Sequence, residues 1–246
     1  DEPLQASPAQ LELRALKILR QAQAAAGAGE TQVAIDLYRK ALTAYQDLDD
    51  FAAQGAIHND LGLILRASGS LNRAAQILQI GLDLAQQGKE PTVVAEARYN
   101  LGLVEYERNN DEGARAHLSS ALNDATALNN LELIGLSNNA LGNLRRRRNE
   151  LTQAISSYTE AATIWEQLGR KEFAAVAYMN IGYCHILRGE ADGAASSFER
   201  AAQSLQETRG ANRDALVPHL TDLSNLARID PAAARDKVLR VLRRKK

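Results

Sequence analysis

Several classes of site and location find little support in this sequence. Cys184 is the only cysteine among 246 residues, so an internal disulfide and a cysteine zinc site are excluded. No apolar run is long enough to span a bilayer, and no signal-peptide pattern is visible. The formal net charge of −1 gives no bulk attraction to nucleic acid or membrane. The first residue, Asp1, is expected of a processed or trimmed chain, which leaves a cytoplasmic and an exported location open.

The sequence does contain an internal repeat. A Leu-Gly or Ile-Gly pair recurs every 40 residues, at Leu61-Gly62, Leu101-Gly102, Leu141-Gly142 and Ile181-Gly182. Self-similarity at such a period indicates stacked repeats. A glycine inside helix-patterned sequence costs about 1 kcal/mol relative to alanine. Four of them at one register therefore predict that a second helix lies close against each glycine.

A second pattern follows each glycine at fixed distances. It consists of an alanine, then a large apolar residue, then another small residue: Ala74, Leu78, Gly81; Ala114, Leu118, Ala121; Ala154, Tyr158, Ala161; Ala194, Phe198, Ala201. We expect the small residues to supply the close contact to the glycine. No strand-like alternation competes with the helical spacing, so the predicted class is all-α.

The predicted organisation is a short disordered lead, residues 1–6, followed by one repeat domain over residues 7–246. The repeats are expected at about 7–49, 50–89, 90–129, 130–169 and 170–209, with a degenerate capping pair at 210–246. In the first repeat, Gln21-Ala22 replaces the Leu-Gly pair. Ser7-Pro8-Ala9-Gln10 predicts a helix start, as does Asp230-Pro231 near the end of the chain.

Gly and Asn residues predict where the helices end, since both tolerate a left-handed C-cap. First helices should end near Gly69, Asn109-Asn110, Asn149 and Gly189, and second helices near Gly88, Asn129-Asn130, Gly169 and Gly210. Ser70, Asp111 and Asn149 are expected to cap the second helices.

The Leu-Gly pair followed by Ala-x-x-x-Phe/Tyr resembles the tetratricopeptide repeat, most closely at Ile181-Gly182 with Ala194 and Phe198. The repeat is longer than the family's usual length and lacks its early tryptophan and closing proline. The long period is similar to that of Pins-type scaffolds and some bacterial regulators. The resemblance implies a right-handed α-solenoid of antiparallel helix pairs, with a concave groove lined by the first helices. It also implies a non-enzymatic protein–protein interaction module.

Helical spacing assigns two stripes to each first helix. Ile57, Leu61 and Ile64 form the inter-helix seam, and Cys184 occupies the register of Ile64, which predicts a buried, unreactive thiol. The other stripe is expected to face the groove. Its candidate peptide-binding residues are Asn59, Leu63, Arg66, Tyr99, Leu103, Tyr106, Asn139, Asn143, Arg146, Arg147, Met179 and Tyr183.

The chemistry of this stripe favours an extended, acidic peptide. Asparagine amides match the donors and acceptors of a peptide backbone, arginines pair with carboxylates, and tyrosines offer rigid contact surface. Two alternatives stay open. Asn100 and Asn180 fit a bond within the array as well as a ligand contact. The apolar patch of Met179, Tyr183, Ile186 and Leu187 fits a core covered by the terminal helix equally well.

Two clusters of basic residues raise the alternative of nucleic-acid binding, although without excess positive charge it is weak. Consecutive helical residues point about 100° apart, so in Arg145–Arg148 only Arg146 and Arg147 are expected to face the groove. Arg145 and Arg148 should be solvated, as should the tail Arg243-Arg244-Lys245-Lys246.

Catalytic and metal sites are not expected, and neither is a cofactor. The histidines His58, His117, His185 and His219 fall at unrelated repeat registers. Cys184 and His185 are adjacent in a helix, where neighbouring side chains diverge. The sequence therefore favours a module that binds a protein or peptide; the alternative is a scaffold that associates with itself through its end faces.

Overall fold

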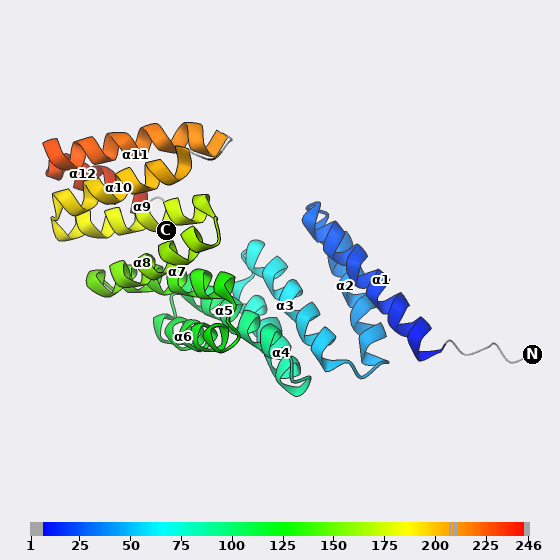
Figure 1. Ribbon diagram of the computed structural model, residues 1–246. Coiled ribbons are helices and arrows are strands. Elements are labelled where there is room, and N and C mark those ends of the chain that lie inside the picture. The colour runs from blue at the N-terminus through cyan, green and yellow to red at the C-terminus, as the bar shows by residue number, and fades with distance from the viewer. Residues whose placement is uncertain (1–6, 207, 209–210, 244–246) are drawn as a thin grey trace, which may run out of the picture. The chain divides into compact units, whose positions relative to one another are not determined.

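The computed structural model describes residues 7–206, 208 and 211–243, and all regular secondary structure in these residues is α-helical (Figure 1). The chain divides into two compact units, Asp1–Leu128 and Asn129–Lys246. A single domain over residues 7–246 stays a prediction.

The first unit consists of three helix pairs. Its helices are α1 (Pro8–Gly27), α2 (Thr31–Gln46), α3 (Phe51–Ala67), α4 (Leu71–Gln87), α5 (Pro91–Glu107) and α6 (Asp111–Ala127). Each odd-numbered helix packs against the next helix in sequence, α2 and α4 pack against the following pair, and α3 also packs directly against α5.

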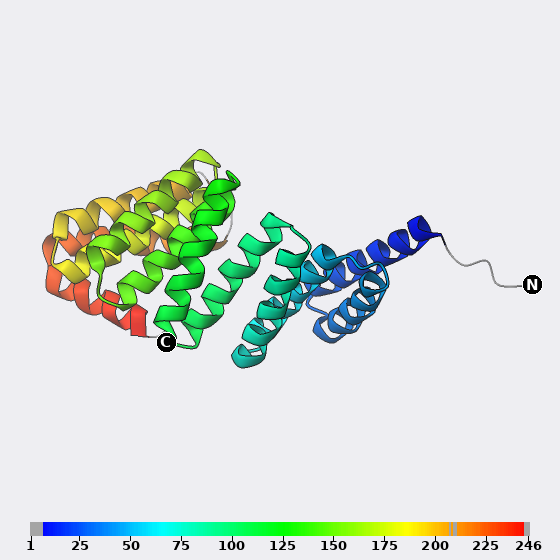
Figure 2. The ribbon, with the colours of Figure 1, turned by 90° about the horizontal axis from the view of Figure 1, so that it is seen from below.

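The second unit contains α7 (Leu131–Arg147), α8 (Leu151–Gln167), α9 (Lys171–Arg188), α10 (Ala191–Gln206), α11 (Ala211–Ile229) and α12 (Pro231–Arg243). The pairs α7–α8 and α9–α10 stack through α8 and α9, and α10 then packs against α11 (Figure 2). The predicted all-α fold of consecutive helix pairs, the tetratricopeptide-like solenoid architecture, is confirmed.

Local capping explains most helix boundaries. Ser7 and Gln10 form the predicted capping box at α1. The predicted caps of α6 and α8 were wrong by one residue: Asn110 caps α6 by accepting from the Gly113 N–H at 3.2 Å, and Glu150 is the N-cap of α8. The reason is that Asn149, like Asn109, is needed in the left-handed turn before the cap.

The predicted left-handed positions are confirmed at Gly69, Asn109, Asn149 and Gly189 after first helices, and at Asn129 and Gly169 after second helices. The predicted helix end at Gly88 is confirmed, since α4 ends at Gln87 with Gly88 as its C-cap, but Lys89 rather than Gly88 takes the positive φ. Gly88 serves a different purpose, since a Cβ on it would lie 2.5 Å from the backbone N of Ala52. Gly210 lies outside the described residues.

The repeated glycine does lie against the second helix of its own pair, as predicted. A Cβ added to Gly102, Gly142 or Gly182 would lie 2.6, 2.6 or 2.5 Å from Leu118, Tyr158 or Phe198, and Gly62 lies equally close to Leu78. The expectation that the small residues make this contact was wrong. Ala154 and its equivalents are buried, but the large side chain one turn later covers the glycine.

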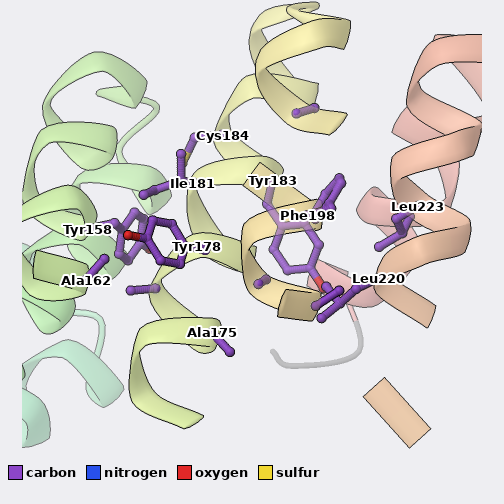
Figure 3. Packing of buried hydrophobic residues seen from close by; sticks show 14 of the residues in the cluster. Tyr158, Ala162, Ala175, Tyr178, Ile181, Tyr183, Cys184, Phe198, Leu220 and Leu223 are labelled. Atoms are coloured by element: carbon purple, nitrogen blue, oxygen red, sulfur yellow. The ribbon is translucent and has the colours of Figure 1, made fainter. Parts of the chain in front are cut away.

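The core of the second unit is shown in Figure 3, where Tyr158, Phe198 and Leu223 fill the space between successive helices. Cys184 is fully buried there, and Leu144 and Val104 at the same register are buried as well. The seam assignment therefore holds for these three, while Ile64 is half-buried.

Candidate interaction surfaces

The first helices α3 and α5 bring one set of predicted residues together, because the two helices lie side by side. The predicted residues are Leu63, Arg66, Tyr99, Leu103 and Tyr106, and we call them, together with the acids Asp60 and Glu96 on the same two helices, the α3–α5 face. Beneath it, the Asn100 side-chain amide donates to Asn59 Oδ1 at 2.9 Å. Both asparagines are buried, so Asn59, predicted to bind peptide, instead ties α3 to α5.

The apolar and aromatic members of the face are only partly covered. Leu63 is 36% exposed, while Tyr99, Leu103 and Tyr106 are half-buried. Burial raises the pKa of Tyr99, and the charge of Arg66 opposes that shift. The phenol therefore stays neutral at physiological pH and offers contact area with a polar end.

The charge of Arg66 is already balanced within the face. Its guanidinium contacts the Glu107 carboxylate at 2.6 Å through Nη2, with a second bond from Nε at 2.9 Å. A ligand carboxylate at this point would have to compete with Glu107. Arg66 therefore provides less attraction for an acidic ligand than the sequence alone predicted.

Two carboxylates of this face were not among the predicted site residues. Desolvation raises the pKa of Asp60, although hydrogen bonds from Tyr38 and Gln23 oppose the shift. Desolvation also raises the pKa of Glu96, and the negative charge of Asp60 adds to it. The sequence held a signal for both, because neither acid has a Lys or Arg three or four residues away on its own helix.

The predicted α7 residues are tied to the neighbouring α8 through one phenol. The Tyr158 hydroxyl donates to Asn143 Oδ1 at 2.8 Å, and the Arg146 Nε donates to the same hydroxyl at 3.3 Å. Asn139 and Arg147 are half-buried on the same helix. Asn143 and Arg146 thus have a structural role whether or not they also meet a ligand.

One of the two flanking arginines differs from expectation. Arg145 was predicted to be solvated, but its side chain reaches α8 and hydrogen-bonds Ser157. Arg148 is exposed, as expected, and pairs with Glu150 at 2.8 Å. The methylene chain of Arg145 is long enough to reach the paired helix α8, although the 100° spacing of helical residues directs its Cα–Cβ bond away from the groove.

On α9 the predicted residues lie deeper. Met179 is half-buried, but Tyr183 is 2% exposed and Ile186 is 3% exposed. The Tyr183 ring lies edge-on to Phe198 at 5.7 Å, next to Leu220 (Figure 3). The core interpretation of this patch is therefore the correct one for Tyr183 and Ile186, and Tyr183 does not form part of the surface.

The described residues contain no group of three or more His, Cys, Asp or Glu side chains that could hold a metal ion. His185 instead contacts the Glu190 carboxylate at 2.6 Å, and burial lowers the pKa of His117. Among the described helices, none combines the length and apolar character that a membrane span requires.

The helix pairs coincide with the part of the sequence that matches a known family. The sequence model of the tetratricopeptide repeat matches residues 19–89 and 139–211, which together make up more than half of the chain. The chain belongs to the tetratricopeptide repeat family. Tetratricopeptide repeats are typically non-catalytic scaffolds for protein–protein interaction. The comparison with curated proteins found no significant match.

Solved structures share this tetratricopeptide fold at low identity. BtubC from P. vanneervenii has a TM-score of 0.73 and 19% identity, with 83% of this chain and 85% of that chain covered. A Rap protein complexed with Competence and Sporulation Factor has a TM-score of 0.70 and 16% identity, with 92% and 63% covered. The quorum sensor NprR from B. thuringiensis has a TM-score of 0.70 and 10% identity, with 96% and 64% covered. This chain thus spans less than two thirds of Rap and of NprR, and the likeness shows the fold alone.

Proposed function

We propose that this chain is a non-catalytic adaptor whose α3–α5 face binds a segment of a partner protein. The observation that carries the proposal is the combination, on one face, of the half-buried carboxylate of Asp60 and the exposed carboxylate of Glu96 with the partly exposed side chains of Leu63, Tyr99 and Leu103. Two similar structures add support, since one is a complex with Competence and Sporulation Factor and the other is a quorum sensor.

The charge of this face favours a segment with a basic residue. The negative charge of Asp60 helps to raise the pKa of Glu96, and a Lys or Arg placed near both carboxylates would offset that repulsion. Arg66 does not provide this cation, because Glu107 holds it. An apolar side chain next to the basic residue would then bury area against Leu63 and Tyr99. The predicted preference for an acidic segment is therefore replaced, for this face, by a basic one.

The α7 residues are candidates for a separate contact in the second unit. Asn139 and Arg147 are half-buried, and the Asn143 and Arg146 side chains share the Tyr158 hydroxyl. The Arg146→Glu variant should bind an acidic group at this contact more weakly than the wild type does. The Arg148→Glu variant should show a smaller loss of affinity. Equal losses would assign the effect to a diffuse positive field.

The test is site-specific photo-crosslinking in cells of the source organism. A benzophenone side chain at Leu63 should capture a defined partner, and one at Ile80, which is exposed on the second helix α4, should not. Asp60→Lys together with Glu96→Lys should abolish the Leu63 crosslink. The matched control is Asp83→Lys on α4, where the carboxylate is exposed and bonds only within its helix to Gln79 at 2.9 Å.

Two results would contradict the proposal. One is a crosslink from Ile80 to the same partner at equal yield. The other is a Leu63 crosslink that survives both charge reversals. A purified partner segment should then bind the wild-type chain in solution, with its basic residue required.

A second candidate function is self-association through α1. Its outer side exposes Leu11, Leu13 and Leu16, with Leu13 68% exposed. Leu13→Glu should then convert an oligomer to a monomer in light scattering, whereas Val33→Glu, at an exposed position of α2, should not. A wild-type monomer at high concentration would eliminate this candidate.

The nucleic-acid alternative loses support, because Arg145 and Arg148 bond to Ser157 and Glu150.

A further inference from the structure

The C-terminal helix α12 is amphipathic. Ala234, Val238, Val241 and Leu242 recur at i, i+4, i+7 and i+8, and Arg235, Asp236 and Arg240 lie on the other side. In the structure, Ala234 and Val238 are fully buried, while Arg235 and Arg240 are exposed. The helix thus presents one small and one β-branched side chain to the rest of the second unit.

The partner of α12 within the chain departs from the repeat pattern. Elsewhere a second helix packs against its own first helix and, within each unit, against the first helix of the following pair, as α4 packs against α3 and α5. α12 packs against its own first helix α11 and also against α9, the first helix of the preceding pair. It therefore lies on the first-helix side of the stack.

The face of α9 is more buried than the same face elsewhere, and at Tyr183 the side chains of Phe198 on α10 and Leu220 on α11 contribute to that burial. At one register Leu63 is 36% exposed and Leu103 and Asn143 are half-buried, yet Tyr183 is 2% exposed. One turn on, Arg66, Tyr106 and Arg146 are half-buried, yet Ile186 is 3% exposed. The surface that α3, α5 and α7 present is interior at the C-terminal half of α9.

The attachment of α12 is limited. Ala234 and Val238 are fully buried, and Val241 and Leu242 are only partly buried against the same core. Lys237 pairs with Asp222 at a position where the carboxylate is 63% exposed. An exposed pair of this kind contributes little to stability, because water screens the two charges. The Asp230 side chain caps the helix by accepting from the Ala233 N–H at 3.0 Å. A second helix with a better apolar stripe could therefore compete for the same place.

The N-terminal half of α9 borders an apolar hollow together with α10 and α11. A hollow of about 100 Å³ is lined by Val176, Met179, Leu216 and Leu220, and Val176 is 40% exposed. Val176 and Met179 lie on the same stripe of α9 as Tyr183, toward its N-terminus. A partner helix that followed this stripe would cover both the part of α9 that α12 contacts and the apolar hollow.

We propose that the C-terminal half of the α9 face is a binding site for an amphipathic helix, which α12 fills in this chain and which a partner helix displaces. The partner would carry a small residue and a β-branched residue one turn apart, as Ala234 and Val238 are, and a further apolar turn for the hollow at Val176. This site is formed by α9 of the second unit, and the proposal does not depend on the α3–α5 face of the first unit.

The experiment uses the full chain and a fluorescent peptide of residues 230–243. Val238→Asp places a charge in a fully buried position and should release α12, so this variant should bind the added peptide in fluorescence anisotropy. The wild-type chain should bind the peptide at least about ten-fold more weakly, because its site is competent only while α12 is detached. A peptide that carries Val238→Asp itself should not bind either chain.

Matched variants separate release from general damage. Arg235→Asp adds an aspartate on the exposed side of α12 and should behave as wild type. Lys237→Glu removes the pair with Asp222 and should bind the peptide with intermediate affinity. Circular dichroism of Val238→Asp should show the loss of one short helix. A collapse of helicity throughout the second unit would instead show that α12 is integral to the fold and would overturn the proposal, as would a folded Val238→Asp chain that does not bind the peptide.

Discussion

The aromatic ring of Tyr158 occupies the place where a Cβ on Gly142 would be: an added Cβ would lie 2.6 Å from Cε1. The same relation joins Gly182 to Phe198, and Gly102 to Leu118. Each helix pair is thus locked by one large side chain that rests on a backbone without a side chain. This explains why the glycine and the large residue recur together.

Gly142→Ala should destabilise the second unit, because Tyr158 is fully buried and its ring cannot move without displacing α8. Overpacking of this kind costs about 1–3 kcal/mol. The control is Gly27→Ala, where nothing lies within 4 Å of the new Cβ and helix propensity favours alanine. Denaturant unfolding measures both; equal stability of Gly142→Ala and the wild type would show that the glycine contact does not hold the pair together.

Asn143→Ala tests the adjacent polar contact. Helical spacing assigned Asn143 to the ligand-facing stripe, but its amide oxygen accepts a hydrogen bond from the Tyr158 hydroxyl at 2.8 Å. A net cost of about 0.5–1.5 kcal/mol is expected for losing that bond. The same substitution combined with Tyr158→Phe should cost less than the sum of the two single changes, and strictly additive losses would show that the two side chains do not interact.

The buried pair of Asn59 and Asn100 should behave asymmetrically. Asn100→Ala leaves the Asn59 oxygen buried without its donor, and such an orphan costs about 1–3 kcal/mol. The double replacement of both asparagines by alanine should therefore add little to the single loss. A double-mutant cycle in urea measures the coupling, and a coupling energy near zero would contradict a shared hydrogen bond between α3 and α5.

Cys184 should react slowly with thiol reagents, since it is fully buried and burial raises the pKa of its thiol to about 11. The unfolded thiol ionises near pH 9, so between pH 9 and 11 the folded state holds a proton that the unfolded state has lost. Stability should therefore fall as pH rises through this window, by about 1.4 kcal/mol per unit. Cys184→Ala should flatten that fall, and rapid labelling without denaturant would contradict the burial.

The sequence was informative about repeats and helix ends because both depend on local rules. The period of 40 placed the helix pairs, and Gly or Asn in left-handed turns placed the ends of helices. The same rules could not decide which side chain covers Gly142. That depends on how far α8 slides along α7, and this in turn depends on packing across the whole pair.

Long-range packing also limited the prediction of the site. Helical spacing gives the direction of Asn59 and Tyr183, but it does not show whether another helix covers that direction. Asn59 is buried because α5 lies against α3, and Tyr183 because it lies against α10 and α11. The packing of α12 on α9 is a contact outside the repeat pattern, which no periodicity in the sequence encodes.

Asp60 should show a conflict between stability and binding. Its pKa is raised in the folded state, so the folded chain binds a proton more readily than the unfolded chain, and stability falls as pH rises through this window. Ionised Asp60 is therefore a net cost at neutral pH, and Asp60→Asn should raise the melting temperature there while both chains converge at pH 3. The same change should weaken binding of a basic partner segment, because it removes one of the two carboxylates that attract the cation. Groups that are unfavourable for folding yet required for binding are typical of functional sites.

Melting curves at pH 7 and pH 3, with titration of the captured segment, measure both effects. The control is Glu107→Gln, which should not raise the melting temperature because the Glu107 carboxylate is already paired with Arg66. If Asp60→Asn lowers stability at pH 7, the hydrogen bonds from Tyr38 and Gln23 outweigh the desolvation of the carboxylate, and Asp60 is a structural residue of the α3–α5 face.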